Sequence, residues 1–523
     1  MTSTATGRSS VGLRSERGPV LGALMLCIAL IAVDATILAT AVPSIVAELG
    51  GFSQFPWLFS IYLLTAAVTT PLCGRLADVV GRRPLLLGGV ATFVAASVLC
   101  GVAWSMPVLV AARALQGIGA GAIQPAALTV VGDLYTVEER ARVQGYIASV
   151  WAAASVVGPA LGGIFSEYLS WRWIFFVNVP LGALAAWMLL RGFTEQHAPR
   201  RSAVDWAGAG LLTTGSSLLI LSLLQGGTTW AWASPPGILV PVASALLLAA
   251  FVLRQRRAPE PLLPLWVFRD RVLVAGNLTS LGVGALLIGL TSFVPPYVQG
   301  VLGTGPLVAG FALAAFTLGW PLAATYSGRI YLRIGFRDTT LLGAGVVVVG
   351  TLGCAVAFTA RASVWQVAAL CFVVGLGMGL TASPSLVAVQ SVVGWERRGV
   401  VTGTNLFCRS MGSALGAAAF GAVANVTLAA RLADAPPALA GRAPDSVDSS
   451  ALVLGDGGGA APDVLAFVRA ALADASHHVF VAMCAVAVLT LVAAAVMPRH
   501  LAASSPGGGS GGGLGGGDAV ERP

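Results

Sequence analysis

Charged residues are scarce in this chain. Asp, Glu, Lys and Arg together make up 10% of its 523 residues, whereas a typical soluble domain carries about 25%. Hydrophobic residues make up 56% and the mean hydropathy is +0.85. A soluble core cannot enclose that much apolar surface, so the composition excludes an ordinary soluble globular protein and predicts a membrane protein.

Several motifs of energy-driven and enzymatic chemistry are also missing. Lysine is absent, and no GxxxxGK[ST] phosphate-binding loop occurs, which argues against ATP as the driving force. No HExxH or GxSxG pattern occurs either, so we expect no enzymatic activity and no cofactor. The seven cysteines lack CxxC spacing, which argues against a disulfide framework and against a metal site.

Long apolar stretches are what the chain has in place of charge. A helix of about 20 residues, at about 1.5 Å rise per residue, crosses the hydrocarbon of a bilayer. Fourteen stretches approach or exceed this length, at residues 20–42, 56–76, 85–104, 107–131, 143–166, 173–190, 206–225, 237–253, 273–298, 307–327, 339–359, 365–390, 400–426 and 479–497. The sequence therefore predicts an all-α polytopic membrane protein.

Arginine is distributed unevenly over the segments between these stretches. An even number of spans puts both termini on one side of the membrane, and placing them inside leaves most of the 30 arginines in cytoplasmic segments. This predicts a protein of the inner (plasma) membrane with both termini cytoplasmic. The net charge of +8 then reflects topology and contact with anionic membrane lipid, and we expect no nucleic-acid partner.

The short gap between the second and third spans concentrates charge. It reads Gly74-Arg75-Leu76-Ala77-Asp78-Val79-Val80-Gly81-Arg82-Arg83-Pro84. A basic loop that only sets topology would explain the arginines but not Asp78 or the two glycines. The run resembles the loop 2–3 signature of the major facilitator superfamily. That resemblance implies a transporter whose conformational switch, at the cytoplasmic face, contains Gly74, Arg75, Asp78, Gly81, Arg82 and Arg83.

The chain also contains an internal repeat. Gly328, Arg329, Gly335 and Arg337 follow Gly74, Arg75, Gly81 and Arg83 at an offset of 254 residues, and Glu396, Arg398, Gly403 and Gly416 follow Glu138, Arg140, Gly145 and Gly158 at an offset of 258. Repeats of this kind are the usual construction of secondary transporters. Leu332 stands where the second copy would have Asp78, and Ala417 where it would have Pro159, so we expect the first half to carry the switch.

The repeat divides the chain into two six-span halves with two further spans inserted between them. We expect a cytoplasmic segment at 1–19, bundles at 20–190 and 273–497, and the inserted spans at 206–253. An external loop at 427–478 is expected to be partly disordered with a short amphipathic helix near 463–475, and a Gly-rich cytoplasmic tail at 498–523 to be disordered. This layout resembles the fourteen-helix drug:proton antiporter branch of the superfamily, which implies the major facilitator fold.

Asp34 is the only acidic residue deep inside a predicted span, where an ionisable group is costly and is by default a functional candidate. It begins a stretch, 34–43, that resembles the first-helix signature of the fourteen-helix branch. Arg113 opens a stretch, 113–121, that resembles the fourth-helix motif of the superfamily, at a depth close to that of Asp34. An ion pair that couples protons or substrate to transport is therefore expected. The alternatives are a structural partner for an arginine and, for Arg113, snorkelling to the interface.

Gly158-Pro159-Ala160-Leu161-Gly162-Gly163 resembles the fifth-helix motif associated with exporters of the superfamily. Ala154, Gly158 and Gly162 share one helix face, so helix packing alone is the alternative explanation. Pro159 removes a backbone donor and bends the helix. Three further polar residues, Gln116, Asn405 and Arg409, are candidates for lining a substrate cavity; for Arg409, about 16 Å into its span, structural pairing is an equal alternative.

Together these features predict a proton-coupled efflux transporter, a drug or antibiotic:H⁺ antiporter that exports amphipathic small molecules by alternating access. It is expected to act as a monomer. One alternative is an exporter or flippase of a lipid or cell-envelope metabolite, and another is a transporter-like receptor without transport. The sequence does not name the substrate, because specificity is spread over many helices.

Overall fold

The computed structural model describes residues 12–50, 57–195, 205–226, 230–231, 233–359, 361–436 and 461–499. Within these ranges the chain is helical, and fourteen of its helical segments are long and apolar enough to cross a membrane. Each overlaps one of the predicted spans, which confirms the all-α, fourteen-span prediction. The ends of the chain, 1–11 and 500–523, lie outside the described residues, as does most of the tail predicted to be disordered.

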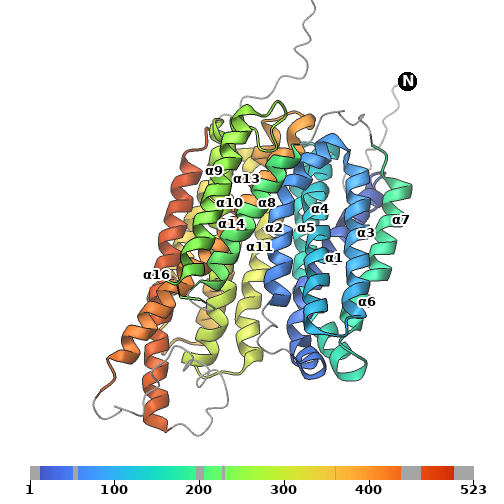
Figure 1. Cartoon of the computed structure of the whole chain (residues 1–523). Coiled ribbons are helices and arrows are strands. Elements are labelled where there is room, and N and C mark those ends of the chain that lie inside the picture. The colour runs from blue at the N-terminus through green and yellow to red at the C-terminus, as the bar shows by residue number, and fades with distance from the viewer. Residues whose placement is uncertain are drawn as a thin grey trace, which may run out of the picture.

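The first half is one bundle, drawn blue to teal in Figure 1. Its helices are α1 (Gly18–Leu49), α2 (Trp57–Val79), α3 (Arg82–Gly101), α4 (Met106–Leu134), α5 (Val137–Tyr168), α6 (Trp173–Phe176) and α7 (Asn178–Gly192). Apolar side chains from α1, α3, α4 and α7 form its core. A capping box between Thr136 and Glu139 starts α5, because each side chain satisfies a backbone N–H at the helix end.

The second half repeats this arrangement, yellow to red in Figure 1. It comprises α10 (Arg271–Pro296), which continues as the π-turn η3 (Tyr297–Val301), α11 (Pro306–Ile334), α12 (Phe336–Ala357), α13 (Val364–Ser391), the short turn η4 (Trp395–Arg397), α14 (Arg398–Ala433) and α16 (Pro462–Ala495). A separate apolar cluster, including Phe316, Met378 and Phe480, forms its core. The division into two six-span bundles plus an insertion is therefore what the structure contains.

The inserted helices α8 (Trp206–Gln225) and α9 (Pro235–Arg257), green in Figure 1, pair with each other and lie against both halves. Ile220 of α8 packs with Leu64 of α2 and Ala414 of α14. Leu212 of α8 belongs to a second cluster that contacts both of these helices. The insertion thus covers the line along which α2 meets α14.

Helices extend into both ends of the segment 427–478, which the sequence predicts to be an external loop. α14 continues to Ala433, and the expected short amphipathic helix is the first part of α16, which begins at Pro462 instead of residue 479. The two helices extend because Leu428 and Leu432 pack against an apolar stripe of α16, so each helix buries the other's apolar face. Figure 1 shows these ends projecting beyond the bundle. Residues 437–460 lie outside the described residues.

Candidate functional site

Asp34 lies at the centre of a buried polar cluster in the first half. Its Oδ2 is 2.6 Å from Nη1 of Arg113, and its Oδ1 accepts hydrogen bonds from Nε2 of Gln116 at 2.7 Å and from Nδ2 of Asn178 at 3.2 Å. Asp34 and Arg113 are each 1% exposed. The ion pair expected from their matched depths is therefore present, and it is closed off from solvent.

Backbone and aromatic groups fix the arginine in place. Nε of Arg113 donates to the carbonyl oxygen of Leu58 at 3.0 Å, and the guanidinium lies 4.3 Å from the centre of the Tyr62 ring. Gln116 accepts from Arg113 at 2.7 Å and donates to Oγ of Ser97 at 2.9 Å. The Asp34 cluster, which we define as Asp34, Ser97, Arg113, Gln116 and Asn178, therefore ties α1, α3, α4 and α7 together, with α2 against its arginine.

Gln116, a candidate for lining a substrate cavity, bonds to protein groups in this structure. Its side chain is fully buried, because it bridges the ion pair to Ser97 inside the first bundle. Sequence reasoning missed Ser97, Asn178 and Tyr62. A signal existed for Asn178, a lone amide after the apolar run 174–177, but nothing in the sequence says that it meets Asp34.

The glycine motif of α5 packs directly beside this cluster. Thr36, two residues after Asp34, donates from Oγ1 to the carbonyl oxygen of Ala154 at 2.9 Å. A Cβ on Gly158 would come within 2.0 Å of the same Oγ1, so α1 and α5 can approach this closely only with glycine there. Gly162 is also buried, whereas a Cβ on Gly163 would meet nothing within 4 Å. Pro159 falls within α5, but its side chain lies outside the described residues.

Asp78 connects the two halves at one end of the molecule, here named the Asp78 end. Its carboxylate accepts from the backbone N–H groups of Gly399 at 3.0 Å and Val400 at 2.9 Å, at the start of α14. A helix N-terminus offers unpaired N–H groups and partial positive charge, so a carboxylate binds well there. A Cβ on Gly74 would lie 2.6 Å from the carbonyl oxygen of Gly399, which explains the glycine at this crossing of α2 and α14.

Arg82 extends the Asp78 contact to further helix ends. It donates to Asp78 and to Oδ2 of Asp133 at 3.0 Å, and to the carbonyl oxygen of Trp395 at 2.6 Å. Arg398 in turn donates to Oδ1 of Asp133 at 3.0 Å. Asp133 is thus held between an arginine of each half. Asp133, Trp395 and Arg398 complete a polar network, here named the Asp78 network, of which the sequence motif showed only Asp78 and Arg82.

The remaining residues of the motif fasten neighbouring segments to this network. Gly81 has a φ of +106°, which favours glycine, and the backbone N–H groups of Arg82 and Arg83 that follow donate to the carboxylate of Glu195 at 2.8 and 3.1 Å. Arg75 is 2.6 Å from Glu260, in the segment after the inserted helices. The residues of this motif therefore contact the segment that follows the inserted helices as well as both halves.

The described hydrogen bonds between the halves gather at the Asp78 end. They include those of Asp78, Arg82 and Arg398 and the bond from Tyr331 Oη to the carbonyl oxygen of Val137, while one contact, Ser155 to Thr317 at 3.3 Å, lies nearer the middle. At the opposite end, Arg172 pairs with Glu48 inside the first half at 2.5 Å. The structure is therefore held closed at the Asp78 end.

Asn405 and Arg409, the other two cavity candidates, differ from each other. Asn405 is 3% exposed and bonds to Ser280 and to the carbonyl oxygen of Gly276 on α10, so it joins two helices instead of lining an open cavity. Arg409 is half-buried, and its guanidinium has no hydrogen bond or ion pair with the described residues. The structural pairing that was the alternative for Arg409 is therefore absent from the described part of the chain.

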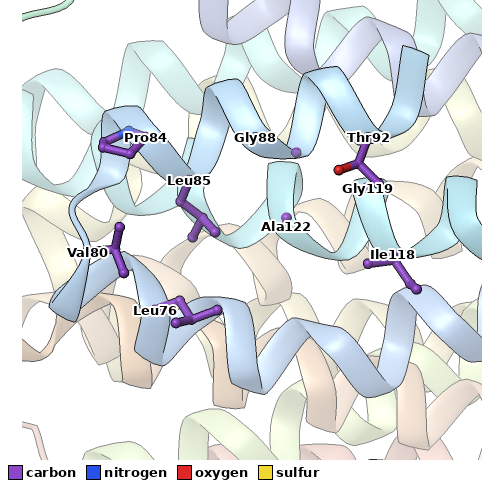
Figure 2. Close-up of a pocket in the computed structure, with 10 residues that line it drawn as sticks. Leu76, Val80, Pro84, Leu85, Gly88, Thr92, Ile118, Gly119 and Ala122 are labelled. Carbon is purple, nitrogen blue, oxygen red and sulfur yellow. The ribbon is translucent and has the colours of Figure 1, made fainter. Parts of the chain in front are cut away.

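An apolar hollow lies between α2, α3 and α4, away from these charges. Figure 2 shows Leu76 and Val80 facing Pro84 and Leu85, with Gly119 and Ala122 of α4 between the two helices. Its lining holds no charged residue, and Val80 is 47% exposed. It is an apolar groove without the charged groups that coupling chemistry requires.

Comparison with known proteins agrees with this geometry. A sequence model of the Major Facilitator Superfamily matches residues 24–417. Multidrug transporter protein MdtP of Bacillus subtilis is 34% identical over 420 residues, covering 80% of this chain and 77% of the relative. Multidrug resistance protein 3 of the same organism is 34% identical over 429 residues, covering 82% and 83%.

Solved structures show the same fold at low sequence identity. The human organic anion transporter MFSD10 superimposes with a TM-score of 0.61 at 15% identity, over 92% of this chain and 99% of that one. At this identity the likeness concerns the fold alone. The family match over most of the chain and the relatives at 34% identity lead to one conclusion: the chain belongs to the major facilitator superfamily, whose members are membrane transporters.

Proposed function

We propose that this transporter exports amphipathic small molecules from the cytoplasm in exchange for protons. The observation that carries the proposal is the Asp34 cluster, which contains the only acidic residue deep within the described spans and encloses it completely. The names of the two bacterial relatives support efflux of drugs as the activity. The arginine-rich Asp78 end is assigned to the cytoplasmic side by the positive-inside rule.

Protonation of Asp34 would change the forces in this cluster. An ionised Asp34 attracts Arg113 and accepts from Gln116 and Asn178, whereas a protonated carboxyl loses the Coulomb attraction and becomes a donor. In the observed state the carboxyl is closed to solvent on both sides. Loading and release of the proton therefore require a change of conformation, as strict exchange demands.

The contact between Thr36 and α5 supplies a route from this proton site to the second half. α1 carries both Asp34 and Thr36, Thr36 bonds to α5, and α5 contacts α11 through Ser155 and Thr317. A shift of α1 after protonation would thus act on an interface between the halves. The Asp78 network would open as the other end closes, which assigns it to the conformational switch.

Reconstitution into vesicles tests the proposal. Wild-type protein, oriented with a pH gradient across the membrane, should drive accumulation of a fluorescent amphiphile that stops when an ionophore collapses the gradient. Asp34→Asn, at equal incorporation, serves as the matched control and should show no gradient-driven flux. Flux that ignores the gradient would contradict proton coupling, and absence of any flux with substrate still bound would favour a receptor.

A further inference from the structure

Arg409 stands apart from the other deep charges of the chain. It lies about 16 Å along α14 from Arg398, near the middle of the membrane. An unpaired charge at that depth is costly, and such a residue usually marks a functional site whose partner must be found. The deep carboxylate of Asp34 is already engaged by Arg113, Gln116 and Asn178. Within the described residues nothing neutralises Arg409.

Neighbouring residues on α14 show which way this part of the helix faces. Asn405, one turn earlier, bonds to α10, and Leu406 packs in the apolar cluster of the first half. One turn later, Oγ of Ser413 donates to the carbonyl oxygen of Gly284 on α10 at 3.0 Å. Arg409 lies on the same side of the helix, between α10 and the first half. Its partial exposure therefore opens toward the interior of the transporter and not toward lipid.

The internal repeat places Trp151 of α5 at the position equivalent to Arg409, exactly one 258-residue offset earlier. Trp151 is 38% exposed, although Ala148 and Ala154 on either side along its helix face are 9% and 2% exposed. On the lipid face of α5, by contrast, exposure is general, as for Val156 at 64%. An exposed ring within a buried stripe indicates space between the halves, with Trp151 on one wall.

A second donor without an acceptor among the described residues lies beside Asn405, one turn before Arg409 on α14. Asn277 of α10 is 5% exposed, its Oδ1 is contacted by Asn405 at 3.4 Å, and its Nδ2 has no partner among the described residues. Buried donors are normally satisfied, so an orphan donor on α10, beside the residue one turn before Arg409, indicates a missing acceptor in this region. Both groups suit a ligand oxygen that carries negative charge.

We propose that Arg409 binds an acidic group of the exported molecule, while Trp151 contacts its aromatic or apolar body. The substrates are then amphipathic monoanions or zwitterions, such as aromatic carboxylic acids. This inference rests on the proposed function, since it specifies the substrate class of the same transport pathway. Arginine suits this task because its planar fork binds a carboxylate through two parallel hydrogen bonds.

The test uses one fluorescent xanthene dye in two forms, the free carboxylic acid and its methyl ester. Binding to detergent-purified protein is followed by fluorescence polarisation, which requires no transport. Wild type should bind the acid about tenfold more tightly than the ester, because hydrogen bonds to a charged partner are worth a factor of this order. Arg409→Gln should remove that preference by weakening the acid alone, Arg409→Lys should restore part of it, and Trp151→Leu should weaken both forms.

Stability measurements separate this role from a structural one. Since Arg409 has no partner among the described residues, Arg409→Gln should not lower the unfolding temperature of the substrate-free protein, whereas loss of a structural arginine would. Equal binding of acid and ester, no binding of the acid, or equal loss of both forms in Arg409→Gln would overturn the inference. Arginine-dependent binding without gradient-driven flux would instead refute the proposed exchange of protons and leave the anion site standing.

Discussion

The two halves of this transporter have the same backbone arrangement but different polar side chains at equivalent positions. Gly81 and Gly335 both have positive φ, +106° and +88°, directly before equivalent helices. Asp78 of the first half bonds to the second half, however, whereas the equivalent Leu332 is 48% exposed and apolar. In the interior, the first half presents Trp151 where the second presents Arg409. The repeat thus preserves turns and packing, while the buried ion pair and Asp78 lie in the first half and Arg409, without a partner among the described residues, lies in the second.

Among the substitutions that test this difference between the halves, removal of the deep carboxylate should have the largest effect on transport and stability. Asp34→Asn is expected to abolish gradient-driven flux and to leave Arg113 buried without a counter-charge, which costs about 3–5 kcal/mol in comparable buried pairs. The double variant Asp34→Asn with Arg113→Gln should recover most of that stability but no flux. Flux and unfolding temperature of both variants check this. Wild-type flux in either variant would remove Asp34 from the coupling mechanism.

Asp78 and Leu332 offer a matched pair for the switch. Asp78→Ala deletes the acceptor for Gly399, Val400 and Arg82, so transport should slow by about tenfold or more while substrate affinity stays within a factor of two. Leu332→Ala, at the equivalent place, should change the rate by less than about twofold, because surface substitutions cost little. Equal slowing in both variants would show that the second copy of the motif still functions as a switch.

Glycine substitutions test the close helix packing that the two halves have in common. Gly158→Ala and Gly416→Ala should each destabilise the fold by about 1–3 kcal/mol, since the added Cβ would lie 2.0 Å from Thr36 and 2.7 Å from Ala285. Gly163→Ala, with open space around it, should be neutral or stabilising by up to about 1 kcal/mol. Thermal unfolding in detergent measures all three, and a cost at Gly163 equal to that at Gly158 would refute packing as the reason for the motif.

The ion pairs at the end opposite Asp78 should matter least. Glu48→Gln and Asp474→Asn each break an exposed pair, with Arg172 and Arg431, and should cost less than about 1 kcal/mol. Hydrogen bonds from Arg172 and then Trp171 lower the pKa of Glu48 from its ordinary value near 4.5. Its contribution is therefore complete above that pH and is lost as the pH falls below it. Thermal unfolding at neutral and acidic pH measures both variants. A loss of stability above about 1 kcal/mol in Glu48→Gln at neutral pH would show that the pair with Arg172 holds that end closed.

Depth and helix count could be predicted from sequence, but helix neighbours could not. Apolar length gave the spans, and distance along α1 and α4 was enough to bring Asp34 and Arg113 to the same level. Asn178 and Asp133 join their networks across long sequence separations, and only the packing of helices decides that. The partners of Gln116 and Asn405 could not be predicted for the same reason: a polar residue in a span faces either a cavity or a partner, and composition does not distinguish the two.

The position of α8 has a consequence for traffic within the bilayer itself. The halves meet along α2 and α14 and along α5 and α11, and α8 covers the first of these seams through Leu212 and Ile220. We therefore expect lipid tails, and any apolar compound dissolved among them, to reach the second seam more readily than the first. The transporter is thus asymmetric in the plane of the membrane: the inserted helices cover the seam between α2 and α14, and the seam between α5 and α11 is the side that we expect to face lipid. A photoreactive lipid should accordingly label α5 and α11 in preference to α2 and α14.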